Sequence, residues 1–199
     1  MSAPDLLVAL GPVLDALQAL GVRHYVGGSI ASSAHGVARA SIDADVVAEL
    51  RPEHARPLVA ALFSAYYVPE ERVRDALARR ASFNVIHLET MVKVDVFVSK
   101  GRPFDRRAMG RARPLWPGAE AGGPALLLAS AEDIVLAKLE WYRRGGEVSD
   151  RQWTDVLGVL RVGGESLDRP YLETGAVELG VADLLVRAMR DSVDGPSAP

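Results

Sequence analysis

The chain has 199 residues, 49% hydrophobic and 25% charged, a composition typical of a globular protein with one sizeable domain, or one domain with an appendage. The formal net charge of −3 excludes general polyanion binding through bulk charge, so any nucleic-acid contact requires a local basic patch. The absence of cysteine excludes disulfides, thiolate metal sites and a cysteine nucleophile.

The first residues, MSAPDLLVALG, lack the basic segment and the long apolar segment of a secretory signal peptide. No uncharged run approaches the roughly 20 residues that a membrane-spanning helix needs. We therefore expect a cytoplasmic protein with no membrane partner.

Helical and extended patterns alternate over the first hundred residues. Leucines and valines at helical spacing predict an amphipathic first helix that ends at Gly21. Two apolar stretches on either side of Glu89 and Thr90 predict an antiparallel hairpin. The expected helices are 5–20, 29–35, 52–63 and 70–80, and the expected strands are 22–26, 42–48, 66–68, 82–88 and 91–98.

Beyond residue 98 the pattern changes twice. Residues 99–124 are rich in glycine and proline, which predicts an irregular hinge. Ser130 and Ser149 then begin capping-box patterns and predict helices that end at paired glycines, with two further helices over 169–178 and 181–191. We predict an α+β fold: a core of mixed sheet flanked by helices over 1–115, a helical region over 116–193, and a disordered tail over 194–199.

Three aspartates lie on the predicted strands. Side chains alternate across a strand, so Asp43 and Asp45 share one face, and Asp95 shares a face with Lys93 and Phe97 on the later strand. If the two strands are neighbours, the three carboxylates converge and repel one another unless a cation lies among them. Mg²⁺ (or Mn²⁺) suits such a site, and two ions can clamp the attacking and leaving oxygens of a phosphoryl displacement. The alternative is that these are solvated residues at strand ends.

A glycine turn precedes these strands. Gly27 and Gly28 follow a strand and precede a helix, and without Cβ atoms they allow a ligand to approach the backbone. Backbone N–H groups and the Ser29 hydroxyl could hold phosphate oxygens at the start of the helix. The alternative is a plain strand–helix turn with Ser29 as the N-cap. Neither the Walker nor the dinucleotide-binding glycine pattern is present.

Most of residues 20–160 resemble the nucleotidyltransferase superfamily with the DNA polymerase β-like fold. The matching motifs are Gly28-Ser29, Ile42-Asp43-Ala44-Asp45 and Val94-Asp95-Val96. The segment AEDIVLAKLEWYRRGGEVSDRQWTDVLGVL is similar to the carboxy-terminal helices of the AbiEii-like bacterial toxin-type enzymes. Its matching residues are Glu132, Asp133, Lys138 and Asp155.

The resemblance implies transfer of a nucleoside monophosphate from an NTP to an acceptor hydroxyl on RNA, protein or a small molecule, with release of pyrophosphate. It implies that Asp43 and Asp45 bind two metal ions, while Asp95 completes one metal site and helps to deprotonate the acceptor. It also implies that Ser29 and the turn amides hold the triphosphate, and that an antitoxin protein is a possible partner.

The sequence leaves three positive groups with two interpretations each. Arg39 could contact phosphate or be a surface residue. Lys138, within an apolar helical stretch, could contact the triphosphate, or could pair with Asp155 or extend to solvent. The arginines in 102–113 could bind RNA phosphates or be a solvated charged segment.

The sequence departs from the resemblance at one position, because toxin-type enzymes often have threonine where Ser41 stands.

A second hypothesis is a non-catalytic nucleotide-binding or antitoxin-like module on the same fold. The presence of Asp43, Asp45 and Asp95 disfavours it, because an inactive relative has no need of all three carboxylates.

Overall fold

The computed structural model describes residues 3–37, 43–115 and 126–194. The chain forms two compact units. The first, which we call the sheet unit, comprises Met1–Gly27 and Ala40–Leu128, and the second, the helical unit, comprises Gly28–Arg39 and Ala129–Pro199. Residues 28–39 therefore belong to the helical unit, although the residues before and after them in the sequence belong to the sheet unit.

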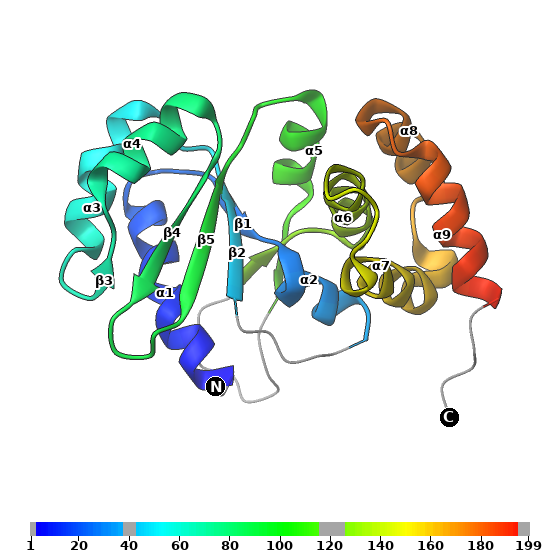
Figure 1. Ribbon diagram of the computed structural model, residues 1–199, viewed down its shortest axis with the longest axis horizontal. Helices are drawn as coiled ribbons and strands as arrows, with labels where there is room; N and C mark the ends of the chain where they lie inside the picture. Colours follow the sequence, from blue (N-terminus) through cyan, green and yellow to red (C-terminus); the bar gives the residue numbers. More distant parts are fainter. Residues whose placement is uncertain (1–2, 38–42, 116–125, 195–199) are drawn as a thin grey trace. The chain divides into compact units, whose positions relative to one another are not determined.

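The sheet unit is built on one mixed sheet (Figure 1). Within the described residues the strand order is β3-β4-β5-β2-β1-β7-β6. Strand β2 pairs in parallel with β5 and antiparallel with β1, and β4 and β5 form an antiparallel hairpin. The strands are β1 (His24–Val26), β2 (Asp43–Ala48), β3 (Tyr66–Tyr67), β4 (Ser82–His87), β5 (Lys93–Val98), β6 (Arg113–Leu115) and β7 (Leu126–Leu128). The helices are α1 (Ala3–Ala19), η1 (Pro52–His54), α3 (Ala55–Leu62), α4 (Glu70–Arg79) and α5 (Pro103–Arg111).

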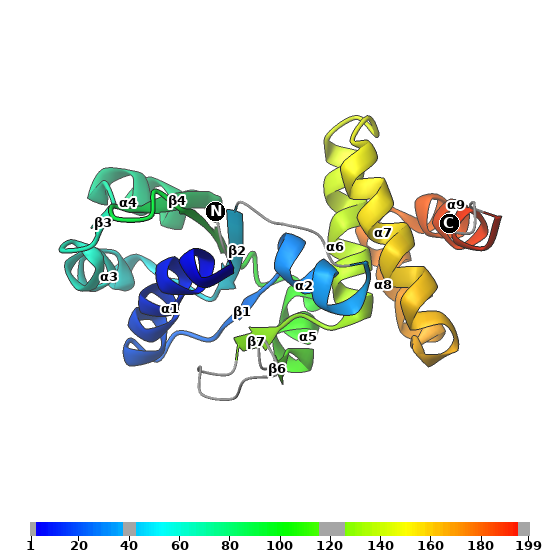
Figure 2. The same ribbon diagram turned by 90° about the horizontal axis from the view of Figure 1, so that it is seen from below.

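One face of this sheet is the core of the unit. Alternate residues of β2 and β5, including Ala44, Val46, Val94 and Val96, are fully or almost fully buried. Helices α1 and α4 pack against the strands, and α3 lies beside α1 (Figure 2). Period-two burial leaves the intervening residues of β2 and β5 on the opposite, partly exposed face.

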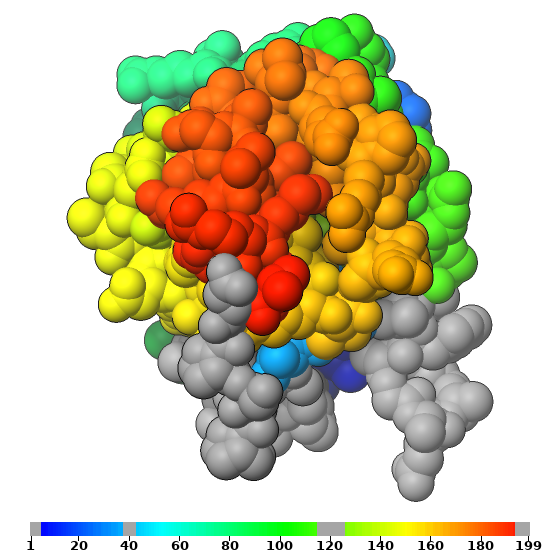
Figure 3. All heavy atoms as spheres, turned by 90° about the vertical axis from the view of Figure 1, so that its right-hand side faces the viewer, coloured from blue at the N-terminus to red at the C-terminus, as the bar shows by residue number. Residues whose placement is uncertain are grey.

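The helical unit consists of α2 (Gly28–His35), α6 (Ala131–Arg144), α7 (Asp150–Gly163), η2 (Gly164–Ser166), α8 (Arg169–Leu179) and α9 (Ala182–Asp194). Helices α2, α8 and α9 pack on the α6–α7 pair, and α8 and α9 lie side by side on the face shown in Figure 3. The side chains of Ser130, Ser149 and Asp168 accept N-cap hydrogen bonds at the starts of α6, α7 and α8.

The contact between α2 and α7 depends on glycine. A Cβ atom on Gly36 would lie 2.9 Å from the backbone nitrogen of Val159 and 2.9 Å from the carbonyl oxygen of Ser32. A Cβ atom on Gly158 would lie 3.4 Å from the backbone nitrogen of Val37, which is an ordinary contact. The close approach of the two backbones therefore depends on Gly36, where a larger residue would not fit.

The predicted α+β class, the hairpin, and the helices opened by Ser130 and Ser149 are confirmed. The prediction that 99–124 is irregular is wrong where the segment is described. Helix α5 forms because Pro103 occupies its first turn and Asp105 accepts the backbone N–H of Arg102 at 2.9 Å. Strands β6 and β7 were also not predicted.

The predicted domain ranges remain a prediction, and the two units differ from them at α2 and β7, which are grouped with the helices and the sheet respectively. The last five residues of the predicted tail lie outside the described residues. None of the helices in 3–37, 43–115 and 126–194 has the length and apolar character needed to cross a bilayer.

Candidate active site

The three predicted aspartates lie on adjacent strands of the sheet unit. In the parallel register of β2 and β5, Asp45 stands directly opposite Asp95, and Asp43 stands opposite Lys93. All four residues are partly exposed, and they alternate with fully buried neighbours on both strands. The carboxylates therefore share the sheet face that is turned away from the core.

A lysine lies among these carboxylates. The Nζ atom of Lys93 is 2.7 Å from Oδ2 of Asp95 and 4.0 Å from Oδ1 of Asp43. The hydrogen bond to Asp95 is the main cause that raises the pKa of Lys93 above its ordinary value of 10.5. Burial lowers this pKa in part, and the charges of Asp95, Asp43 and Asp45 raise it further. The ammonium is therefore held in its charged form by the acidic surroundings.

Strand β4 adds an amide to the same face. Asn84 pairs with Asp95 across the hairpin, so a row of polar residues runs from Asn84 through Asp95 to Asp45. Asn84 was not predicted as a site residue. Counting outward from the expected turn at Glu89 and Thr90 would have set it opposite Asp95. The sequence placed Lys93 on the face of Asp95 but assigned it no role.

The donor set fits a hard divalent cation. Among the described residues, no three carboxylate or imidazole groups are already arranged as metal ligands. The available donors are nevertheless carboxylate oxygens, which Mg²⁺ and Mn²⁺ prefer. One positive charge, the Lys93 ammonium, already lies within 4.0 Å of both Asp43 and Asp95. Asp43, Asp45 and Asp95 are therefore the residues that would hold the metal.

The glycine turn begins on the strand next to this cluster. The backbone N–H of Gly27 donates to the carbonyl oxygen of Asp45 at 2.9 Å, which fastens the end of β1 to β2. Gly28, the first residue of α2, has a φ of +52°, a conformation that favours glycine. Within the helical unit Ser29 is buried, and Ser32 donates to its carbonyl oxygen at 3.1 Å. The nucleotide-binding roles of Gly27, Gly28 and Ser29 stay a prediction, and the N–H of Gly27 is already bonded.

Lys138 forms an ion pair inside the helical unit. Its Nζ atom lies 2.8 Å from Oδ2 of Asp155, and the two side chains are only 11% and 7% exposed. The pair joins α6 to α7, as the structural interpretation of Lys138 expects. Its predicted nucleotide contact stays a prediction.

Two further acidic residues of the AbiEii-like pattern attach α6 to α8. The Tyr171 hydroxyl donates to Oδ1 of Asp133 at 2.5 Å, and the backbone N–H of Asp168 donates to Oε1 of Glu132 at 3.1 Å. Both acidic side chains are buried. Their contacts give them a structural role at the start of α6.

The predicted arginines differ in their surroundings. Arg39 lies outside the described residues. Arg102 bonds Asp105 at 2.8 Å, Arg106 donates to the carbonyl oxygen of Gly101, and Arg113 donates to that of Gly110 at 3.1 Å. These contacts stabilise α5 and its ends, so this basic segment is ordered.

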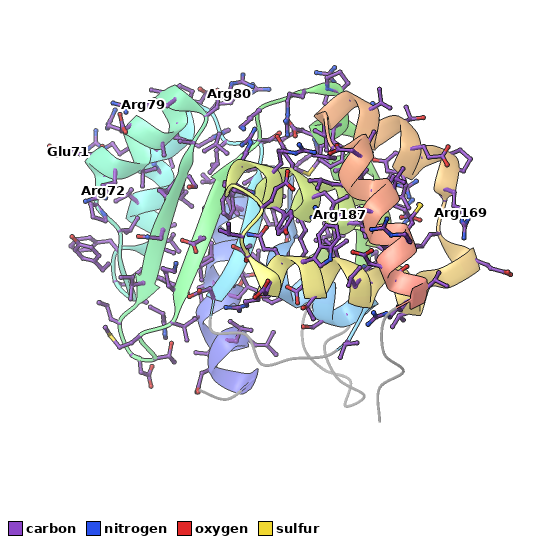
Figure 4. The ribbon with its side chains drawn as sticks, turned by 45° about the vertical axis from the view of Figure 1, so that its right-hand side comes forward. Glu71, Arg72, Arg79, Arg80, Arg169 and Arg187 are labelled. Atoms are coloured by element: carbon purple, nitrogen blue, oxygen red, sulfur yellow. The ribbon has the colours of Figure 1, made fainter. Side chains whose placement is uncertain are left out.

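Other arginines are prominent outside the predicted set. In the helical unit, Arg187 points from α9 toward α7, with its guanidinium carbon 4.1 Å from the centre of the Trp153 ring (Figure 4). In the sheet unit, Arg72, Arg79 and Arg80 project outward around α4 (Figure 4). Neither group was predicted as a site, and neither lies on the carboxylate-bearing strands.

Comparison with proteins of known structure identifies the fold of this chain. Neither a scan of protein-family models nor a search of curated proteins found a match. The solution structure of the antibiotic-resistance factor ANT(2'')-Ia is similar with a TM-score of 0.54 and 16% identity, over 91% of this chain and 94% of that one. A nucleotidyltransferase-like protein from Paracoccidioides brasiliensis is similar with a TM-score of 0.54 and 17% identity, over 96% and 94%. The predicted nucleotidyltransferase-like fold is thus confirmed, and the AbiEii-like subgroup stays a prediction.

Proposed function

We propose that this protein is a metal-dependent nucleotidyltransferase, which transfers a nucleoside monophosphate from an NTP to an acceptor hydroxyl. The observation that carries the proposal is the register that sets Asp45 opposite Asp95, with Asp43 on the same face. This arrangement occurs on a nucleotidyltransferase-like fold, and its carboxylate oxygens suit the ions that accompany triphosphates.

In the proposed reaction the acceptor oxygen forms a bond to the α-phosphorus, and the bond from that phosphorus to the bridging oxygen of pyrophosphate breaks. Asp43 and Asp45 would hold the cation, which would supply Lewis-acid stabilisation of the phosphate charge. Asp95 completes the site and accepts the proton of the acceptor hydroxyl. Its side chain is 22% exposed against 47% for Asp43, so it is the less hydrated of these two carboxylates.

The finer part of the proposal is a toxin-type enzyme with an antitoxin partner. Its support is the pattern of Glu132, Asp133, Lys138 and Asp155 on α6 and α7. Expression in a bacterial host should arrest growth, and Asp45→Asn should abolish the arrest at equal protein level. An acceptor of small-molecule type, as an antibiotic would be, predicts normal growth and altered drug resistance instead.

The central experiment incubates purified protein with each α-labelled NTP, Mg²⁺ or Mn²⁺, and a cell extract. Asp43→Ala/Asp45→Ala is compared with Glu70→Ala/Asp75→Ala, a control that removes two carboxylates from ion pairs on the surface of α4 in the same unit. We expect the wild type and the control to transfer label to one class of acceptor, and the first double variant to transfer none.

Each alternative has its own result. NTP binding without label transfer under any condition would favour the non-catalytic module. Equal transfer by Asp43→Ala/Asp45→Ala and wild type would contradict the carboxylate mechanism. Label found in RNA, protein or a small molecule identifies the acceptor class.

A further inference from the structure

Lys93 has no assigned part in the proposed transfer, although its ammonium forms ion pairs with two of the three carboxylates. It contacts Asp95 at 2.7 Å and reaches within 4.0 Å of Asp43. Its side chain is 38% exposed, so it is accessible to dissolved ions.

The position of Lys93 follows from strand geometry. Residues two apart on β5 share a face, so Lys93 must lie on the side of Asp95, and the parallel register sets it opposite Asp43. Strand β5 is paired on both sides, with β2 and β4, so the backbone that carries the lysine is fixed. The fold of the sheet thus sets Lys93 on the face of the carboxylates, and its side-chain conformation brings the ammonium to Asp95.

A divalent cation bound by Asp95 would lie beside the Lys93 ammonium, which is 2.7 Å from Oδ2 of that carboxylate. The ammonium and the metal ion are both positive, and at contact distance from one carboxylate they repel each other. Three neighbouring carboxylates without any cation also repel one another. The cluster is therefore stabilised by either cation, and the two compete for the same place.

We propose that the Lys93 ammonium is the resident counter-ion of the carboxylate cluster, and that a divalent cation binds by displacing it from Asp95. Lys93 is then a positioning residue. It sets the metal affinity, and it offsets the repulsion among the carboxylates when no metal is bound. The inference rests on the proposed function, because the competing cation is the metal which that function requires.

The test measures Mn²⁺ binding without nucleotide, by the electron paramagnetic resonance signal of free Mn²⁺. Lys93→Met keeps an apolar stem and removes the charge, and Lys100→Met removes the same charge from an exposed residue just beyond β5. We expect Lys93→Met to bind Mn²⁺ about tenfold more tightly than wild type, because one unit charge at contact distance is removed. Lys100→Met should remain within about twofold of wild type, because its charge is distant and screened.

A second readout is the melting temperature, and a third variant separates charge from packing. In chelator, Lys93→Met should melt below wild type, and Mn²⁺ should raise its melting temperature by more than that of wild type. Lys93→Arg keeps the charge and should bind Mn²⁺ like wild type. A lysine with a purely structural role would lower the melting temperature of Lys93→Met without changing its Mn²⁺ affinity.

The results distinguish failure of the inference about Lys93 from failure of the proposed function. Asp45→Asn should lose Mn²⁺ binding in every background. If it does so while Lys93→Met binds Mn²⁺ as wild type does, or more weakly, the inference about Lys93 is overturned and the proposed function stands. If neither wild type nor Lys93→Met binds Mn²⁺ without nucleotide, the inference about Lys93 is overturned, and the label-transfer assay decides the proposed function separately, because the metal of that function can bind together with the triphosphate.

Discussion

The site carboxylates of the sheet unit and the acidic residues that join α6 to α7 and α8 lie in opposite environments. On the sheet, the side chains of Asp43 and Asp95 are 47% and 22% exposed, and they lie near one another and Lys93. In the helical unit, Asp155 is 7% exposed and paired with Lys138, and Asp133 is buried against Tyr171. The first group is clustered at a partly exposed sheet face, and the second is bonded inside the packing of the helices.

The difference separates two roles for the same functional group. A buried, bonded carboxylate is costly to separate from its partners, so its removal should appear mainly in the free energy of unfolding. Partly exposed carboxylates that crowd one another contribute little to folding, and their removal should appear mainly in ligand binding and catalysis. Asp45→Asn and Lys138→Met test this separation directly, and two further variants test buried packing in each unit.

The largest expected effect is on activity. Asp45→Asn should lower nucleotidyl transfer by about 10³-fold or more, because the metal loses a charged ligand where phosphate charge must be stabilised. Its free energy of unfolding should change by less than about 1 kcal/mol, because Asp45 is partly exposed. Transfer assays and urea unfolding measure the two quantities. Lost activity accompanied by a large loss of stability would remove the distinction between the units.

The opposite profile is expected for Lys138→Met. Asp155 would be left buried without its cation, so the free energy of unfolding should fall by about 3 kcal/mol. Lys138→Met/Asp155→Leu should recover much of this loss, because the unpaired charge is then absent. Urea unfolding measures both, with Lys100→Met as the control for loss of one surface lysine.

The same variants decide between the two interpretations of Lys138. A structural pair predicts that the double variant folds and keeps the NTP affinity of wild type. A triphosphate contact predicts that NTP affinity falls in the double variant even though stability is recovered.

Local patterns explain why much of the sheet could be predicted. Strand alternation placed Asp43, Asp45 and Asp95 on shared faces, and the resemblance implied that their strands come together. Strand β7 escaped prediction because it has three consecutive leucines and no periodicity. Helix α5 escaped because glycine and proline were interpreted as loop residues, although Pro103 and Asp105 form a helix start.

Long-range contacts explain the rest. Helix α2 was assigned to the core because it follows a core strand. Its packing on α6 and α7 depends on residues more than a hundred positions later, with Gly36 and Gly158 at the contact. The ion pair of Lys93 with Asp95 depends on a side-chain conformation, which strand periodicity alone does not determine.

Gly36→Ala tests the close packing of the helical unit. Its Cβ would meet two backbone atoms at 2.9 Å, and backbone cannot move as a side chain can, so the free energy of unfolding should fall by about 2 kcal/mol. Gly11→Ala in α1 is the matched control. No atom lies within 4 Å of its added Cβ, and it should gain about 0.5–1 kcal/mol from helix propensity. Urea unfolding of both variants should therefore give shifts of opposite sign, and equal shifts would mean that the α2–α7 contact adapts.

The smallest effect concerns a buried polar group of the sheet unit, Tyr66, whose hydroxyl donates to the carbonyl oxygen of Ala9 at 2.8 Å. Tyr66→Phe should lower the free energy of unfolding by about 1 kcal/mol near neutral pH. If buried polar groups are structural in both units, nucleotidyl transfer should be unchanged.

The pH dependence gives this prediction its sign. Burial, and secondarily the charge of Asp15, raises the pKa of Tyr66 from 10.0 to about 12. The folded protein therefore retains the phenolic proton at a pH where the unfolded chain has lost it, so this contribution is complete below about pH 10 and is lost between about pH 10 and 12. The stability difference between wild type and Tyr66→Phe should be constant up to about pH 10 and then shrink. A difference that grew above pH 10 would mean that the folded state favours the phenolate, and that Tyr66 belongs with the solvent-facing groups of its unit.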